Sequence, residues 1–342
     1  MRLNKYRRKT IESLIHVVLM CFLLLTAFAI TRAHDLLATV MLLSIYSLLC
    51  ASFFVVMDAV DVAFTEAAVG AVVSTLLLLS TLSLTGRFEK PQREKPLFGL
   101  IIVLTTGALL IYGTLQMPPF GSAAAPIHQH VGSYYINQSY AETGIVNLVT
   151  SVLASYRGYD TFGELVVIFT AGVGVLALLS SQKSYPIAPI DKTILPAPMK
   201  QHHILRVVSK MLIPLILLFA LYVQFHGHTG PGGGFQAGVI FASAIVLYTM
   251  IFGLQAALDV ISVAWLKLFS AFGVLIYSSV GLLSLLSGEN FLDYSVLAQA
   301  PIEAQHLGTL AVEMGIGITV ASTIMLIFFS FSGQMHSIGE AQ

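Results

Sequence analysis

The chain has 342 residues, and its 17 basic and 17 acidic side chains give a formal net charge of zero at neutral pH. Only 10% of its residues are charged and 56% are hydrophobic, with a mean hydropathy of +0.86. Soluble domains carry about 25% charged residues. This composition excludes an ordinary soluble enzyme, gives no indication of a nucleic-acid partner, and predicts an all-α polytopic membrane protein.

A helix needs about 20 predominantly apolar residues to span a bilayer. Nine segments meet this requirement, at residues 11–31, 36–57, 60–85, 97–117, 162–181, 204–225, 235–255, 260–287 and 306–332. Basic residues favour the cytoplasmic side. Eleven of the 17 lie on one side of this arrangement and six on the other, which predicts a cytoplasmic C-terminus, although the basic N-terminus favours the opposite orientation.

The segment 118–161 separates the fourth and fifth spans. Apolar residues recur at helical spacing through 145–156, with polar residues elsewhere around the turn. This pattern predicts an amphipathic helix of about four turns, lying along the outer membrane surface or against a neighbouring protein of a complex. His128 and His130 precede it without a further ligand at metal-binding spacing, so we predict a solvated loop there.

The third apolar segment contains a carboxylate, Glu66, which would cost at least a few kcal/mol if it were ionised within the bilayer. On a helix it shares a face with Ala63 and Gly70, where a second helix could approach closely. Two interpretations stay open: a carboxylate that relays ions, or a protonated side chain hydrogen-bonded to another helix. Asp58 and Asp61 lie one to two turns earlier, at the expected water boundary.

Two further carboxylates lie at the start of the fifth span. Asp160 or Thr161 could cap this helix, and Glu164 would then lie in the first turn, where the helix dipole favours negative charge. The alternative is that these carboxylates form the mouth of an ion path that also passes Glu66.

A glycine-rich turn follows the sixth span. The expected turn consists of a proline and three glycines, Pro231, Gly232, Gly233 and Gly234. It requires unusual backbone dihedral angles and close backbone approach. A nucleotide site is not indicated, because no Lys-Ser/Thr pair follows and a membrane helix precedes the glycines. His226 and His228 beside the turn could pass protons near neutral pH, or could be residues of the membrane boundary.

The last span carries Glu313, seven residues after His306 and on nearly the same helix face. A direct pairing between these two side chains is stretched, because they lie about 10 Å apart along the helix axis. The sequence contains no nucleophile–base set and no cofactor motif. We therefore expect neither an enzyme nor a cofactor or resident metal.

Three stretches of the chain, at 58–70, 157–164 and 227–238, together resemble the multisubunit cation/proton antiporter family (Mrp/Mnh) and the related membrane-bound hydrogenase modules. The first is similar to the D-type hydrogenase protein, the second to the E-type, and the third, the most specific, to the B-type antiporter protein. The resemblance implies a fusion of the C-terminal region of the A-type antiporter protein with the B-type protein. The implied regions are 1–96 (D-like, three helices), 97–185 (E-like, two helices and the surface helix), 186–203 (linker) and 204–342 (B-like, four helices).

The resemblance implies a membrane component for Na⁺/H⁺ exchange in the plasma membrane, with the other membrane proteins of the antiporter complex, Na⁺, H⁺ and the lipid bilayer as partners. Its ion-translocation candidates are Glu66, Asp61, Asp58, Asp160, Glu164, Glu313, His226 and His228. An ion-translocating module of a hydrogenase or complex I-like enzyme, and a purely structural role, are the alternatives. One departure concerns Glu313, since the B-type pattern has Asp at this position.

Overall fold

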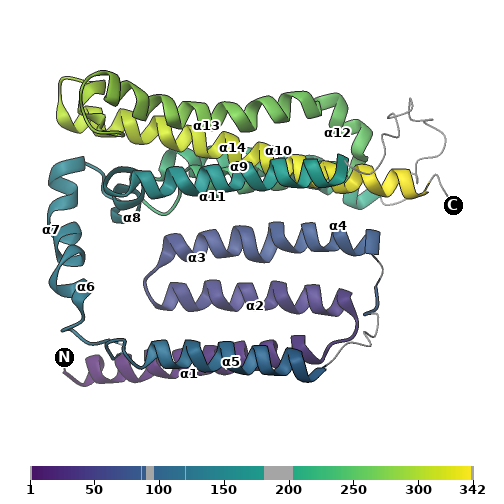
Figure 1. Cartoon of the computed structure of the whole chain (residues 1–342), viewed down its shortest axis with the longest axis horizontal. Helices are drawn as coiled ribbons and strands as arrows, with labels where there is room; N and C mark the ends of the chain where they lie inside the picture. Colours follow the sequence, from purple (N-terminus) through teal and green to yellow (C-terminus); the bar gives the residue numbers. More distant parts are fainter. Residues whose placement is uncertain (1, 86, 90–95, 120, 181–202, 340–342) are drawn as a thin grey trace.

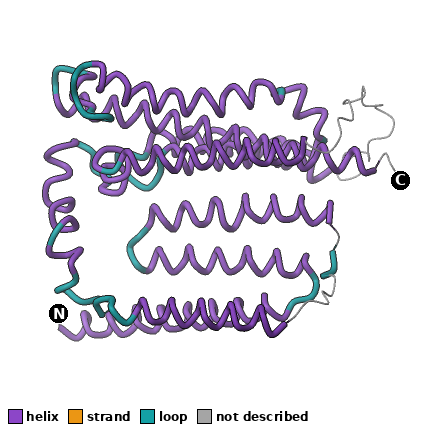
Figure 2. The backbone as a smooth tube through the Cα atoms, in the orientation of Figure 1, coloured by secondary structure: helices purple, strands orange, loops and turns teal. Residues whose placement is uncertain are grey.

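The computed structural model describes residues 2–85, 87–89, 96–119, 121–180 and 203–339. Within these ranges the ordered elements are helices, and the only strand-like contact is one bridge between Asp35 and Phe88. Nine described helical segments are long and apolar enough to span a membrane, which confirms the predicted all-α polytopic fold (Figures 1 and 2). They are α1 (Arg2–Arg32), α2 (Leu36–Val56), α3 with η1 and α4 (Val60–Glu66, Ala67–Ser74, Thr75–Thr85), α5 (Pro96–Thr114), α9 (Gly158–Ser180), α10 (His203–His226), α11 (Gly234–Phe252), α13 (Val263–Leu286) and α14 (Pro301–Gly339).

The third span is continuous but not uniformly α-helical. A π-helical segment, η1, begins directly after Glu66 and lies between α3 and α4. Wider turns of this kind are rare and frequently occur at functional sites. The Ser44 hydroxyl of α2 donates to the Ala71 carbonyl within this segment (2.9 Å), so α2 lies directly against it.

Helices α10, α11, α13 and α14 form a closely packed bundle in the second half of the chain. A Cβ atom added to Gly234 or Gly238 of α11 would lie less than 3.0 Å from backbone atoms of α14. The same holds for Gly273 of α13 against Gly315 of α14. Small residues let membrane helices approach closely enough for dense van der Waals contact, and α14 is the central helix of this packing (Figure 1).

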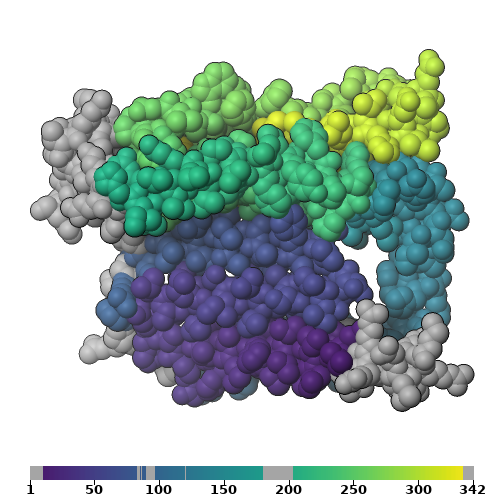
Figure 3. Space-filling model, turned by 180° about the vertical axis from the view of Figure 1, so that it is seen from behind, coloured from purple at the N-terminus to yellow at the C-terminus, as the bar shows by residue number. Residues whose placement is uncertain are grey.

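The first half of the chain is more open. Helices α2 and α3–α4 lie side by side below the bundle in Figure 1, with α1 and α5 beyond them. Two short helices, α6 (Pro126–Gln129) and α7 (Val131–Thr143), return the chain from α5 to the bundle along one end of the molecule. We call α6 and α7 the strap; in Figure 3 it stands apart from α2 and α3 with an opening between them.

The predicted amphipathic helix at 145–156 exists as α8 (Leu148–Ser151) and η2 (Val152–Tyr156). Its polar residues Thr150 and Ser151 are buried inside the chain, whereas Leu153 is exposed. The polar side of this helix therefore faces the interior of the chain, a direction that the amphipathic pattern did not specify. Polar side chains are more stable against polar groups inside the protein than against the hydrocarbon of a bilayer.

Two more short helices complete the second half, α12 (Leu254–Val260) and η3 (Tyr294–Leu297). The predicted linker at 186–203 lies outside the described residues except for its last residue. The predicted region boundaries stay predictions.

Candidate functional site

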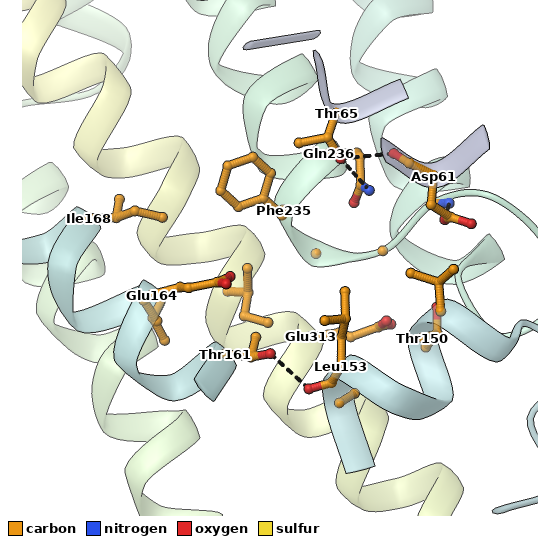
Figure 4. A pocket seen from close by; sticks show the side chains of 17 residues that line it. Asp61, Thr65, Thr150, Leu153, Thr161, Glu164, Ile168, Phe235, Gln236 and Glu313 are labelled. Carbon is orange, nitrogen blue, oxygen red and sulfur yellow. Dashed lines mark hydrogen bonds between the residues drawn. The ribbon is translucent and has the colours of Figure 1, made fainter. Parts of the chain in front are cut away.

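A cavity of about 210 Å³ lies where α3, α8, α9, α14 and the turn before α11 meet (Figure 4). A volume of this size can hold several water molecules. The residues that line it include three carboxylates, Asp61, Glu164 and Glu313, together with Gly232, Gly233 and Gly234. Among the described residues, no lysine or arginine lines the cavity. It lies toward the end of the molecule that carries the strap, because α3, α9, α11 and α14 all begin there.

Asp61 is buried on the first turn of α3 and is held by groups distant in sequence. Its Oδ1 accepts a hydrogen bond from the backbone N–H of Gly232 (3.2 Å) and a longer one from Asn147 Nδ2 (3.3 Å). Asn147 also caps α8 and donates to the Gly230 carbonyl (2.8 Å). Both donors to Asp61 are neutral, and among the described residues no basic side chain forms an ion pair with it.

Glu313 is buried in the first half of α14, with 5% of its surface exposed. Its carboxylate lies beside the backbone of Gly227 and Gly233, since a Cβ added to either glycine would lie 3.1 Å from Glu313 Oε1. Gly233 has a φ of +127°, which side chains with a Cβ rarely adopt. Gly232 and Gly233 of the predicted turn have the unusual dihedral angles expected, whereas Gly234 already begins α11, and the turn makes room for a buried carboxylate.

Glu164 is exposed and points into the cavity from the first turns of α9, toward the same space as Glu313 (Figure 4). Thr161, one turn earlier, donates its hydroxyl to the Leu153 carbonyl (2.7 Å) and so fastens α9 to η2. The three carboxylates thus differ in access: Glu164 lies at the rim, whereas Asp61 and Glu313 lie inside.

Polar side chains that sequence analysis missed complete the site. Gln236 Nε2 donates to Thr65 Oγ1 (2.9 Å), which joins α11 to α3 beside Asp61. The Thr150 hydroxyl donates to the Gly227 carbonyl (2.8 Å), and Asn147 holds Asp61 as described. The only available sequence signal was polarity within otherwise apolar stretches.

Glu66 does not line this cavity. Its Oε1 accepts a short hydrogen bond from the Ser47 hydroxyl of α2, and Ser47 is buried. A Cβ added to Gly70 in η1 would clash with both side chains, so α2 approaches the small-residue face of the third span as predicted. Glu66 therefore forms a second carboxylate site, between α2 and the third span.

The structure places two predicted carboxylates outside both sites. Asp58 is exposed in the turn between α2 and α3, with a φ of +58°. Asp160 forms an exposed ion pair with Arg157 (2.6 Å). Because α9 begins at Gly158, Asp160 and Thr161 lie within its first turn, and the prediction that one of them caps the helix is wrong.

The two histidines beside the turn have different surroundings. The His226 ring stacks on Tyr222 with 4.8 Å between centroids, and its Nδ1 lies 3.2 Å from Thr229 Oγ1. His228 instead contacts His306 of α14 edge-on, at 5.1 Å between centroids. Burial, and then the neighbouring His306, lower the pKa of His228 below its usual value, which favours the neutral imidazole.

Three family models match successive parts of the chain. Residues 21–87 match MbhD and residues 100–188 match MbhE, the D and E components of MBH, and residues 204–326 match the domain related to the MnhB component of the Na⁺/H⁺ antiporter. Each matched region contributes a carboxylate to the cavity: Asp61 from the first, Glu164 from the second and Glu313 from the third. The described fold and this order of regions define a multi-pass membrane protein whose parts match models of subunits of MBH and of the Na⁺/H⁺ antiporter.

Similar proteins narrow this class. A putative antiporter subunit mnhB2 from Staphylococcus aureus (strain Newman) is 33% identical over 133 residues, which are 38% of this chain and 94% of the relative. The A/B protein of a probable K⁺/H⁺ antiporter from Rhizobium meliloti (strain 1021) is 25% identical over 329 residues, 87% of this chain and 32% of the relative. The chain belongs to the multisubunit cation/proton antiporter (Mrp/Mnh) family, and its regions fit a fusion of the C-terminal part of the A-type protein with the B-type protein.

Solved structures agree in fold. A chain of the Mrp complex from Dietzia sp. DQ12-45-1b superposes with a TM-score of 0.74 at 24% identity, over 92% of this chain and 34% of that one. A chain of the archaeal membrane-bound sulfane sulfur reductase (MBS) has a TM-score of 0.52 at 28% identity, over 69% of this chain and 97% of that one. This chain thus spans about a third of the length of its Rhizobium relative.

Proposed function

We propose that this multi-pass membrane protein is a transport subunit of a cation/proton antiporter, and that its cavity is part of the cation path. The observation that carries the proposal is the convergence of Asp61, Glu164 and Glu313 on one cavity that no described basic residue lines. Na⁺ is the cation we propose, and H⁺ the ion exchanged for it.

The chemistry of the site supports exchange. Two buried carboxylates without a cationic partner are costly when both are ionised, so the site gains stability by binding a cation or a proton. A group that holds either one, but not both at once, couples their movements. The described residues contain no group of three or more His, Cys, Asp or Glu that could hold a metal ion. The three carboxylates line the cavity from separate helices, and in this proposal an ion passes between them partly hydrated.

The accessibility of the carboxylates suggests a direction through the protein. A cation would enter at exposed Glu164 and pass to buried Asp61 and Glu313. Glu66 lies five residues beyond Asp61 on the third span, about 7.5 Å along its axis, and offers a second station with Ser47.

The complex and its orientation belong to the same proposal. The chain would assemble in the plasma membrane with the other subunits of the antiporter, and transport instead of catalysis would be its role. The C-terminus would face the cytoplasm. A reporter attached to Gln342 and accessible only from outside the cell would overturn this orientation.

The test uses inverted membrane vesicles that contain the whole complex. We expect Glu313→Gln and Asp61→Asn to abolish Na⁺-dependent proton movement, while immunoblots show normal complex content. K⁺ is tested in parallel, since the Rhizobium relative is named as part of a K⁺/H⁺ antiporter. Wild-type exchange in both assembled variants would mean that this chain only braces the complex.

A second candidate is an ion-translocating module of a redox complex. It is favoured by the matches to MbhD and MbhE and by the structural likeness to the MBS chain. Proton movement that requires an added electron donor, and not a Na⁺ gradient, would support this candidate over the antiporter.

A further inference from the structure

Helix α14 carries a line of polar side chains that lead away from the cation cavity. His306, Thr309 and Glu313 lie within an arc of about 60° on one helix face, at 100° per residue. Along the axis, Thr309 lies about 4.5 Å from His306 and about 6 Å from Glu313. His228 extends the line, because its ring contacts His306 at 5.1 Å.

Two atoms in this line are buried without a hydrogen-bond partner among the described residues, Thr309 Oγ1 and His228 Nε2. Thr309 is completely buried. Hydroxyls in the other spanning helices usually donate to the carbonyl one turn earlier, as Thr249 does to Ile245 (2.7 Å) and Ser278 does to Val274 (2.7 Å). Thr309 does not, so its hydroxyl stays available to another group.

Unpartnered buried polar atoms call for an explanation, and a bridging water is a common one. One water between two hydrogen-bonding groups spans roughly 5 to 6 Å. The axial spacing of Thr309 from Glu313, about 6 Å, matches this span, and that from His306, about 4.5 Å, is slightly shorter. Glu313 also accepts no hydrogen bond from the residues that the structure describes, so it can receive one from a water.

We propose that His228, His306 and Thr309 form a water-bridged proton path to Glu313, separate from the cation route along Glu164 and Asp61. This inference rests on the proposed antiport function and assigns its proton branch. His306 is half-buried, so it can exchange protons with water at the strap end of the protein. The imidazoles take up and release the proton. Thr309 accepts a proton on its oxygen as it gives up its own, and the carboxylate of Glu313 is the final acceptor.

The cation route and the proton route are separate because different helices carry their residues. The cation branch uses carboxylates on α3 and α9, which reach Glu313 through the cavity. The proton branch runs along α14 itself, beside the end of α7, since a Cβ added to Gly144 would lie 3.0 Å from His306 Nε2. Neither His228, His306 nor Thr309 lines the cavity.

The test compares two buried threonines of α14 in the complete complex. Thr309 and Thr323 both have an unpartnered hydroxyl among the described residues, but Thr323 lies ten residues beyond Glu313 and faces Gly172 of α9. We expect Thr309→Val to lower the maximal Na⁺/H⁺ exchange rate roughly tenfold, the factor that corresponds to one lost hydrogen bond. The apparent KM for Na⁺ should stay unchanged and the solvent deuterium isotope effect should rise. Thr309→Ser should restore the rate, and Thr323→Val should resemble the wild type.

Several outcomes would overturn the inference. Wild-type rate and isotope effect in an assembled Thr309→Val complex would do so, as would an equal loss in Thr323→Val, which would indicate a packing effect. Glu313→Gln, measured in the same vesicles, distinguishes failure of the proton path from failure of the proposed function. If Glu313→Gln abolishes exchange and Thr309→Val keeps the wild-type rate and isotope effect, the proton path is wrong and the proposed function stands. If Glu313→Gln behaves as the wild type, the proton path fails, and if Asp61→Asn does so as well, the proposed function itself fails.

Discussion

The two halves of the chain bury their apolar surface to very different extents. In α11 and α14, 56% and 67% of the most apolar stretch is buried within the chain, whereas none of that stretch is buried in α1 or α5. Both kinds of helix have similar hydropathy, between 1.9 and 2.5. Hydropathy therefore identifies a membrane-spanning helix but does not indicate how much of that helix is buried within the chain.

Glycine placement distinguishes the two halves better than hydropathy does. Gly234 and Gly238 of α11 touch the α14 backbone, whereas Gly99, Gly107 and Gly113 of α5 have open space where a Cβ would be. A small residue is required only where a neighbouring backbone occupies the space of a side chain. The comparison predicts that equivalent substitutions will have unequal effects in the two halves.

The largest difference is expected between Gly233→Val and Gly107→Val. Gly233 combines a φ of +127° with a neighbouring Glu313 oxygen, so a β-branched residue is both strained and crowded there. We expect a cost above about 3 kcal/mol and a strong loss of assembled complex. Gly107→Val, in open space, should give normal yield. Quantitative blots of the purified complex make this measurement, and equal yields would show that no tight turn is needed.

A large functional effect is expected from Glu66→Gln in the open half. If Glu66 relays ions, Gln keeps the size but removes the ability to hold and lose a proton, and exchange should fall roughly a hundredfold or more. Glu66→Asp should keep part of the activity. If Glu66 is protonated and structural, Gln preserves the contact with Ser47 and exchange should be nearly normal. Antiport assays with complex content measured in parallel decide between the two.

A moderate stability effect is expected where the second half of the chain forms hydrogen bonds to η2 and to the start of α9. Tyr294 donates its hydroxyl to the Ala154 carbonyl (2.5 Å), and Tyr277 donates to the Gly158 carbonyl (2.7 Å); both rings are buried. Tyr294→Phe should cost about 1 to 2 kcal/mol, because a buried carbonyl loses its donor. Tyr112→Phe on exposed α5 is the matched control and should leave the Tm of the complex unchanged. A Tm shift as large in the control would contradict the comparison.

The smallest effect is expected in the strap. Tyr134 and Tyr156 donate their hydroxyls to Glu142, and these hydrogen bonds lower the pKa of its carboxyl group below the usual value of 4.5. A lowered folded-state pKa means that the contribution to stability is present above the unfolded-state pKa. It is lost as the pH falls through the folded-state value.

Hydrogen exchange of α7 amides, corrected for the intrinsic rate, should therefore show weaker protection of α7 only below pH 4.5. Glu142→Gln should remove this pH dependence and leave the bundle amides unaffected. Unchanged protection of the wild-type strap across this range would mean that the Glu142 contacts do not hold it.

Sequence analysis predicted the spans well because their signal is local. All nine apolar segments became helices, and the glycine turn was recognised from Pro231 and the residues that follow it. It also anticipated a helix against the Gly70 face. These features depend on a residue and its near neighbours in sequence, which a single chain reveals.

The composition of the cavity could not be predicted in the same way. Asn147 and Gly232 donate to Asp61 across separations of 86 and 171 residues, and no local pattern encodes such contacts. The inward orientation of the polar side of α8 and η2 could not be predicted for a related reason. An amphipathic pattern fixes two faces but not which of them faces the interior, and in a membrane protein the polar face can be the inner one.

The cavity joins three regions that family models treat separately, and the S. aureus relative matches the last of these regions over nearly its whole length. In the present chain the same junction forms within one polypeptide. Covalent linkage makes the meeting of these regions an intramolecular event, with a higher effective concentration than separate chains have. The fusion thus fixes the stoichiometry at one Asp61, one Glu164 and one Glu313 per cavity. Assembly of the cavity does not depend on matched expression of three separate proteins.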